Sequence, residues 1–176
     1  MSYKKELEVT KKAAGAAAKI IRDFTKDSSF EIKLKGKNDL VTDADLASEK
    51  KIIETIIHSF PNDEILAEES EQKVSLPEGR VWIIDPIDGT TNFAHGFPAY
   101  CISIALWENK TPVVGLVMEV ANGEVFHAVK GGGAFRNGDP IVISEETDPS
   151  ASLIGTGFPY KDLDLVDNYL VLYSNE

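Results

Sequence analysis

The sequence predicts an α+β fold in which two N-terminal helices pack on a predominantly antiparallel sheet. Apolar residues recur at helical spacing in residues 3–24 and again in residues 43–59, which indicates two amphipathic helices. From residue 100 to residue 142, apolar and polar residues alternate between turn signals, as is typical of strands that form a meander. Helices followed by a run of strands favour a layered α+β architecture.

The first helix is expected to run from Tyr3 to about Phe24. This segment is rich in alanine, which has the highest helix propensity and a small side chain that allows close packing. We therefore assign the helix a structural role. Its apolar positions at helical spacing are Leu7, Ala14, Ala17, Ala18, Ile21 and Phe24.

The second helix is expected to span about residues 43–59. Thr42 followed by Asp45 resembles a capping box, in which each side chain bonds the backbone N–H group of the other residue. The polar segment before this helix, residues 33–38, carries three lysines. We expect a solvated hairpin or loop there, and the functional alternative is a mobile lid near a phosphate.

The rest of the pattern indicates strands and turns. His127 and Trp107 receive packing or surface roles from the usual burial preferences of their residue types. Cys101 is expected to be a buried, small apolar residue. The expected strands are residues 64–67, 81–84, 102–107, 113–120, 124–129 and 141–143, with turns at Asn122-Gly123 and Asn137-Gly138.

Length and composition indicate one compact domain over residues 1–176. Hydrophobic residues make up 43% of the chain, which is enough for a real core. The formal charge of −11 disfavours nonspecific binding to nucleic acid and to anionic membranes. The single cysteine excludes an internal disulfide and a cysteine-based metal site. Because the N-terminus is charged and no apolar run approaches membrane-spanning length, a cytoplasmic location is the default expectation.

Residues 82–93 carry the most informative pattern in the chain. Asp85 and Asp88 stand three residues apart directly after an apolar run. We expect Asp85 to leave its strand at the carboxyl end, where open α/β sheets tend to place ligands. Pro86 would then turn the chain so that Asp88 faces the same space. Carboxylate oxygens arranged in this way suit a hard cation such as Mg2+.

The residues that follow the two acids suit an anion. Gly89 lets the backbone come close to a phosphate, and Thr90 and Thr91 offer both N–H and O–H donors. The alternative interpretation is an ordinary turn, which is favoured for Asp88-Gly89 taken alone. The neighbouring Asp85 and the two threonines favour the metal and phosphate site instead.

The motif Asp85-Pro86-Ile87-Asp88-Gly89-Thr90-Thr91-Asn92-Phe93 resembles the first signature of the inositol monophosphatase family, whose members are Mg2+-dependent, lithium-sensitive phosphatases. Two upstream segments match in the same order, residues 39–45 and residues 65–70. The resemblance continues to about residue 160. It implies the layered sugar-phosphatase fold of that family and a small phosphorylated substrate.

The resemblance also implies a set of metal ligands. Glu68, Asp85 and the backbone carbonyl of Ile87 would hold one Mg2+ ion, and Asp85 and Asp88 would bridge to a second. A third, weaker ion would involve Glu68 and, through water, Asp45. A helix-capping role explains Asp45 equally well.

Substrate contacts and water activation follow from the same resemblance. The backbone N–H groups of Gly89 and Thr90 would bind the phosphate, and Glu68 and Thr90 would orient the attacking water. His95 could meet substrate, although nothing in the sequence gives it a base or metal role. The predicted catalytic residues are Glu68, Asp85, Asp88 and Thr90, and the predicted substrate-binding residues are Glu68, Ile87, Asp88, Gly89 and Thr90.

The C-terminal part of the family pattern is not found in this chain. Family members are longer and carry a second signature, a Trp-Asp pair whose Asp completes one metal site. Trp82 and Trp107 are the only tryptophans, and neither precedes an Asp. Residues 163–173 show helical spacing that stops without a Gly cap. We therefore expect the N-terminal portion of a phosphatase, inactive alone, with an apolar face exposed where the rest would pack.

The predicted function is hydrolysis of a phosphate monoester by metal-activated water. Inositol 1-phosphate is the first candidate, because Thr90-Thr91-Asn92-Phe93 follows the Asp-Gly pair. The alternatives are a related phosphatase acting on fructose 1,6-bisphosphate or 3′-phosphoadenosine phosphate, and a noncatalytic regulatory or binding protein on the same fold. Because family members are commonly dimers, the resemblance implies a homodimer.

Overall fold

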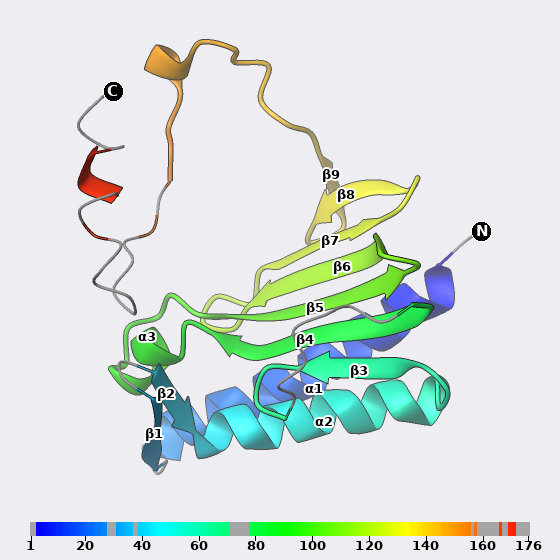
Figure 1. The fold of residues 1–176 in the computed structure, drawn as a ribbon, viewed down its shortest axis with the longest axis vertical. Helices are drawn as coiled ribbons and strands as arrows, with labels where there is room; N and C mark the ends of the chain where they lie inside the picture. The colour runs from blue at the N-terminus through cyan, green and yellow to red at the C-terminus, as the bar shows by residue number, and fades with distance from the viewer. Residues whose placement is uncertain are drawn as a thin grey trace.

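The structure is a computed structural model that describes residues 3–27, 31–36, 39–70, 78–155, 157, 166 and 169–171. Two long helices lie along one face of a sheet with the order β3-β4-β5-β6-β7-β8-β9 (Figure 1). β3 and β4 run parallel, and every other neighbouring pair in this sheet is antiparallel. The predicted α+β class is confirmed. The strands are β3 (Glu64–Ala67), β4 (Arg80–Asp88), β5 (Cys101–Glu108), β6 (Thr111–Glu119), β7 (Val125–Val129), β8 (Gly133–Arg136) and β9 (Asp139–Ile141).

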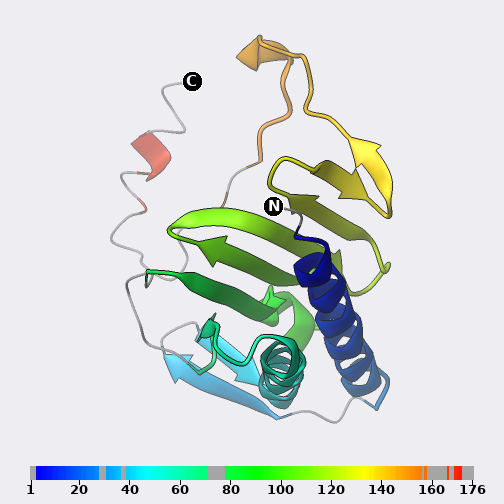
Figure 2. The ribbon, with the colours of Figure 1, turned by 90° about the vertical axis from the view of Figure 1, so that its right-hand side faces the viewer.

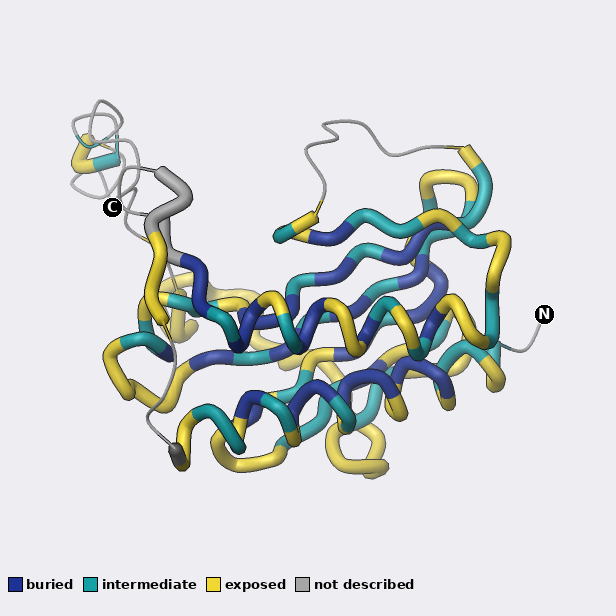
Figure 3. Tube along the Cα trace, turned by 90° about the horizontal axis from the view of Figure 1, so that it is seen from below, coloured by how far each residue is buried: buried dark blue, intermediate teal, exposed yellow. Residues whose placement is uncertain are grey.

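The two predicted long helices are α1 (Lys4–Asp27) and α2 (Asp43–Ser59). They lie side by side on the same face of the sheet (Figure 2). Each helix turns a buried stripe inward and an exposed stripe outward (Figure 3). Four of the five alanines of α1 are fully buried, so α1 can approach its neighbours closely. The core between the helices and the sheet includes Ala13, Ala14, Ala17, Ala18, Ile21, Ile52, Ile56, Trp82, Ile84, Ile102, Ile104 and Leu106.

The start of α2 is a capping box, as predicted from Thr42 and Asp45. The Thr42 N–H group donates to Asp45 Oδ2 at 2.9 Å, and the Asp45 N–H group donates to Thr42 Oγ1 at 3.4 Å. The lysine-rich segment before it forms an antiparallel hairpin of β1 (Ile32–Gly36) and β2 (Asp39–Thr42). Residues 37 and 38 at its tip lie outside the described residues, and the lid alternative stays a prediction.

β4 differs from its prediction. The strand does not end at Ile84 but continues to Asp88, with an irregular register opposite β5 between Asp85 and Asp88. Pro86 therefore lies inside an interrupted strand rather than in a turn that ends it. A proline is compatible with a sheet at such an irregularity, where no ladder hydrogen bond from its nitrogen is needed.

The far end of the sheet holds the other differences. β8 was not predicted. The turn at Asn137-Gly138 is confirmed, with φ angles of 52° and 95° that suit a tight hairpin between β8 and β9. β9 ends at Ile141, so residues 142 and 143 lie beyond it. A short 3-10 helix, η1, covers Pro149–Ala151. Of the predicted C-terminal helix, only Val166 and residues 169–171 are described, and these are helical.

Candidate active site

The parallel pairing of β3 and β4 brings Glu68 beside Asp85. Ala67 lies opposite Ile84 in the register, and the Glu68 N–H group donates to the Ile84 carbonyl at 3.1 Å, which extends the pairing by one residue. The next residue is Glu68 in one segment and Asp85 in the other. Two carboxylates that are distant in sequence thus meet where β3 ends.

Asp85 has the electrostatics of a cation ligand. Burial raises the pKa of its carboxyl group to about 8, and the charge of Glu68, a hydrogen bond with Glu68 and the charge of Asp88 add to the rise. Within the described part of the chain, Asp85 Oδ1 is buried and has no hydrogen-bond partner. A buried carboxylate oxygen without a donor is costly. A hard divalent cation would satisfy this oxygen and offset the repulsion between the acids, so these residues fit Mg2+.

The described carboxylates do not form a complete set of metal ligands. Among residues placed by the structure, no three His, Cys, Asp or Glu side chains are arranged to hold an ion. Glu68 and Asp85 are adjacent, and Asp88 is near enough for its charge to act on Asp85. The complete set of Glu68, Asp85, Asp88 and the Ile87 carbonyl therefore stays a prediction.

Cys101 contacts the site, which the sequence did not reveal. It lies opposite Asp88 in the register of β4 and β5, with its Sγ atom 3.8 Å from Asp88 Oδ2. Cys101 is half-buried, so the expectation of a buried, small apolar residue was wrong. Burial and the charges of Asp88 and Asp85 raise the pKa of the thiol to about 11. The thiol is therefore protonated at neutral pH and can act as a weak donor toward Asp88.

Gly89 occupies a position that only glycine tolerates. Its φ angle is 101°, and a Cβ atom there would lie 2.9 Å from the Ala99 carbonyl oxygen and 3.2 Å from Tyr100 Cβ. Gly89 is the N-cap of α3 (Thr90–Ala94) and has no side chain to cap it. The first N–H groups of a helix lack acceptors within the helix. This arrangement is compatible with the predicted phosphate contacts of Gly89 and Thr90.

Asp45 ties the start of α2 to the motif. The Thr90 hydroxyl lies 3.0 Å from Asp45 Oδ1 and 3.0 Å from the Ile87 carbonyl, and its single proton is donated to one of them. Asp45 is fully buried, and its other oxygen accepts from the N–H and hydroxyl groups of Thr42. The capping role of Asp45 is confirmed and a contact to Thr90 is added. Its role with a third ion stays a prediction.

Glu49 is a buried acid that the sequence interpretation missed. It lies on α2 and is only 2% exposed. One of its carboxylate oxygens accepts the Glu69 N–H group at 2.8 Å, and the other accepts the Ser70 hydroxyl. A signal was present in the sequence, because Glu49 follows Asp45 by four residues and so lies on the same face of the helix.

The sequence model of the inositol monophosphatase family matches residues 3–173. The chain belongs to the inositol monophosphatase family. It is 45% identical over 143 residues to an inositol monophosphatase of Dictyostelium discoideum, which covers 80% of this chain and 52% of that protein. It is 35% identical over 170 residues to the Nus factor SuhB of Pasteurella multocida, which covers 96% of this chain and 64% of that protein.

Solved structures agree with this family assignment. The crystal structure of extragenic suppressor protein suhB from Bartonella henselae matches with a TM-score of 0.88 and 34% identity, covering 97% of this chain and 66% of that one. The family fold implied by the motif is therefore confirmed. The chain spans about half the length of the Dictyostelium relative, at 52%.

Two of the described histidines have contacts outside the carboxylate pair, and a contact between His95 and substrate stays a prediction. His95 ends α3 on the surface, and its Nδ1 atom lies 2.8 Å from the Thr91 carbonyl. His127 is buried in β7 and stacks on Phe135 with a centroid separation of 5.3 Å, which confirms its packing role. Trp107 is half-buried in β5. Water activation in this site therefore cannot be assigned to a nearby described histidine.

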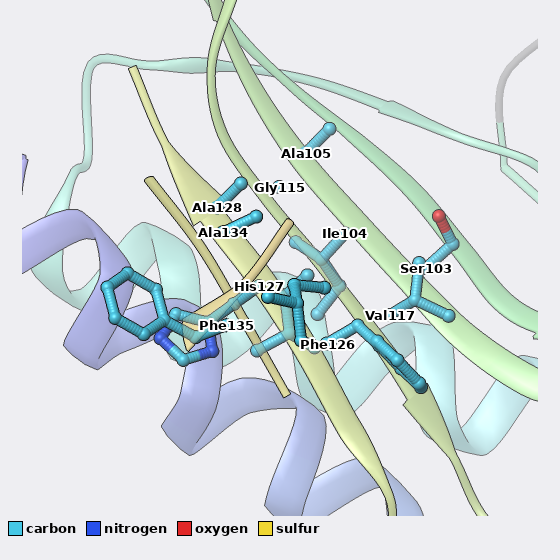
Figure 4. A pocket seen from close by; sticks show the side chains of 12 residues that line it. Ser103, Ile104, Ala105, Gly115, Val117, Phe126, His127, Ala128, Ala134 and Phe135 are labelled. Atoms are coloured by element: carbon cyan, nitrogen blue, oxygen red, sulfur yellow. The ribbon is translucent and has the colours of Figure 1, made fainter. Parts of the chain in front are cut away.

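A hollow of about 280 Å³ lies on the sheet and is lined mostly by small or apolar side chains (Figure 4). Ser103 lines it and stands opposite Asp85 in the register. Val117, which lines the hollow, is 39% exposed. Val142 and Ile143, which follow β9, are 94% and 91% exposed. The expected apolar face toward the rest of a longer protein stays a prediction. In the described part of the chain, no helix is both long and apolar enough to cross a membrane.

Proposed function

We propose that this family member hydrolyses small phosphate monoesters with Mg2+, and that inositol 1-phosphate is its first candidate substrate. The observation that carries the proposal is the buried, unpartnered Oδ1 atom of Asp85 beside the carboxylate of Glu68. A cation would relieve the repulsion between half-buried Asp85 and exposed Glu68, and oxygen ligands select a hard one. The family relationship supports phosphate ester chemistry at such a site.

Each residue of the site then has a role. Glu68, Asp85, Asp88 and the Ile87 carbonyl would hold Mg2+, which when bound lowers the pKa of a water molecule and neutralises phosphate oxygens. Gly89 would let the backbone reach the phosphate, and the absence of a Cβ atom also allows the close approach of Ala99.

Thr90 would orient the attacking water together with Glu68. Its hydroxyl proton is committed to Asp45 or to the Ile87 carbonyl, so a lone pair on Thr90 Oγ1 is left to accept a hydrogen bond. Water that donates to Thr90 would keep its own lone pair directed elsewhere, toward phosphorus. Asp45 would thus act by fixing the direction of the Thr90 hydroxyl.

The test compares the 176-residue chain with a longer form that includes the second family signature. Both are assayed with inositol 1-phosphate, fructose 1,6-bisphosphate and 3′-phosphoadenosine phosphate. We expect the longer form to turn over inositol 1-phosphate best and the short chain to show little activity. Asp88→Asn should abolish activity with the fold retained, whereas Asp139→Asn, on the exposed edge strand β9, should not. Full activity of Asp88→Asn would remove Asp88 from the metal site.

A regulatory function is the second candidate. Its support is the 35% identity to a protein named Nus factor SuhB, together with the incomplete convergence of the described acids. On this alternative the longer form would fold but neither bind Mg2+ nor hydrolyse any of the three substrates. A homodimer and a cytoplasmic location remain predictions, and sedimentation of the longer form tests the first.

A further inference from the structure

We propose that Glu49 is a positioning residue that holds the Glu68 carboxylate in the active site, an inference that rests on the proposed metal-dependent function. Glu49 lies within α2, whereas Glu68 lies 19 positions further along the chain, outside that helix. It binds the turn that follows Glu68, through the Glu69 N–H group at 2.8 Å and through the Ser70 hydroxyl. Glu68 directly follows β3, and its side chain belongs to the predicted metal site.

The two peptide groups that flank Glu68 are both anchored. The Glu68 N–H group donates to the Ile84 carbonyl at 3.1 Å, and the Glu69 N–H group donates to Glu49. The planes of these two peptides determine the φ and ψ angles of Glu68. With both anchored, the direction in which the Glu68 side chain leaves the backbone is determined. Without Glu49, the peptide between Glu68 and Glu69 loses this anchor. The Glu68 side chain can then turn away from Asp85.

The character of Glu49 supports a role beyond packing. Its side chain is 2% exposed, and among the described residues no Lys or Arg forms an ion pair with it. A buried carboxylate is costly unless it is hydrogen-bonded, whereas a neutral side chain of similar size would fill the space more cheaply. Hydrogen bonds to an ionised acceptor are shorter and stronger than neutral ones. Glu49 therefore gives the turn a firmer anchor than packing requires.

One rigid helix positions both residues that would orient water. Asp45 and Glu49 lie four residues apart on the same face of α2. Asp45 contacts the Thr90 hydroxyl, and Glu49 contacts the turn after Glu68. The separation between Glu68 and Thr90 is thus set by adjacent turns of one helix rather than by two independent loops.

The test uses a longer form of the protein, with the second family signature, that carries Glu49→Met, which removes both acceptor oxygens at similar side-chain length. The matched control is Glu54→Met, at an exposed acid of the same helix that pairs with Lys51 at 4.0 Å. We expect Glu49→Met to raise the Mg2+ concentration for half-maximal activity by about tenfold, as is typical when a partner of a metal ligand is lost. The KM for inositol 1-phosphate at saturating Mg2+ should change little, and Glu54→Met should match the wild type. Equal Mg2+ dependence in both variants would overturn the proposal.

Two further measurements keep the test decisive. If Glu49→Met does not fold, Ser70→Ala removes one contact of Glu49 at an exposed residue, and an unchanged Mg2+ dependence there overturns the proposal. Hydrogen exchange of the Glu69 amide in metal-free protein reports the anchor itself. Faster exchange in Glu49→Met than in Glu54→Met supports the anchor even if the wild type proves inactive, in which case the proposed function fails instead. Equal exchange contradicts the anchor whatever the activity.

Discussion

Replacing Asp85 with asparagine tests the electrostatics of the site without any substrate. In metal-free protein, burial and then the negative charges of Glu68 and Asp88 raise the pKa of Asp85 to about 8. In the unfolded chain the pKa of an aspartate is about 3.9. Between these values the folded state holds a proton that the unfolded state releases. The free energy of unfolding therefore falls as the pH rises from about 4 to about 8, and it levels off above that range.

The size of this loss follows from the pKa difference. One pKa unit corresponds to about 1.4 kcal/mol, so the full difference would correspond to roughly 5 kcal/mol. Because Asp85 is partly exposed and shares its proton with Glu68, solvent screening reduces the effect, and we expect about 2 kcal/mol. Asp85→Asn carries no charge and should not show this loss.

The assay is urea unfolding of metal-free wild type and Asp85→Asn, followed by the fluorescence of buried Trp82. From about pH 4.5 to about pH 8.5, the wild type should lose about 2 kcal/mol more unfolding free energy than Asp85→Asn. Titrating groups that do not interact with Asp85, such as His127, whose pKa is lowered by burial, contribute equally in both proteins and cancel. Mg2+ at the higher pH should stabilise the wild type and not the variant. If the two proteins lose stability in parallel over the whole pH range, the pKa of Asp85 is not raised by folding.

Three further outcomes are expected. Gly89→Ala should lower the free energy of unfolding by about 2 kcal/mol or more, because the new Cβ atom would combine a positive φ angle with a clash. Gly79→Ala has the positive φ angle without the clash and should lower it less. Equal losses in urea unfolding would contradict this. Asp63→Asn should cost about 1–3 kcal/mol, because Asp63 accepts from Arg80 and Trp82, with Mg2+ binding unchanged; a changed Mg2+ affinity by calorimetry would count against it. Cys101 should react slowly with iodoacetamide at neutral pH and severalfold faster in Asp88→Asn, since the charge of Asp88 raises the thiol pKa; an unchanged rate would argue against their contact.

Local patterns predicted the elements that depend on local chemistry. The apolar spacing lies within α1, and the capping pair of Thr42 and Asp45 lies at the start of α2. Each feature involves residues close in sequence, so it can be derived from the sequence alone. The turn at Asn137-Gly138 also follows from two residues that tolerate positive φ angles. The path of β4 past Pro86 could not be predicted in this way, because it depends on continued pairing with β5.

The site shows the same division. Asp85 to Thr90 are contiguous, so their motif was visible in the sequence. Glu68 was assigned by resemblance, since its place beside Asp85 depends on the parallel pairing of β3 with β4. Glu49 was missed because an acid within a helix ordinarily faces water, and only the turn at Glu69 gives it a buried partner. Cys101 was misjudged because its contact with Asp88 crosses between strands.

Calorimetric titration of the chain with Mg2+ shows whether Glu68 and Asp85 form a cation site. The wild type should bind Mg2+, and Glu68→Gln should bind at least about tenfold more weakly. Glu64→Gln changes an exposed acid at the start of the same strand and should bind like the wild type. Equal binding by all three proteins, or no binding by the wild type, would show that these two acids do not bind the ion.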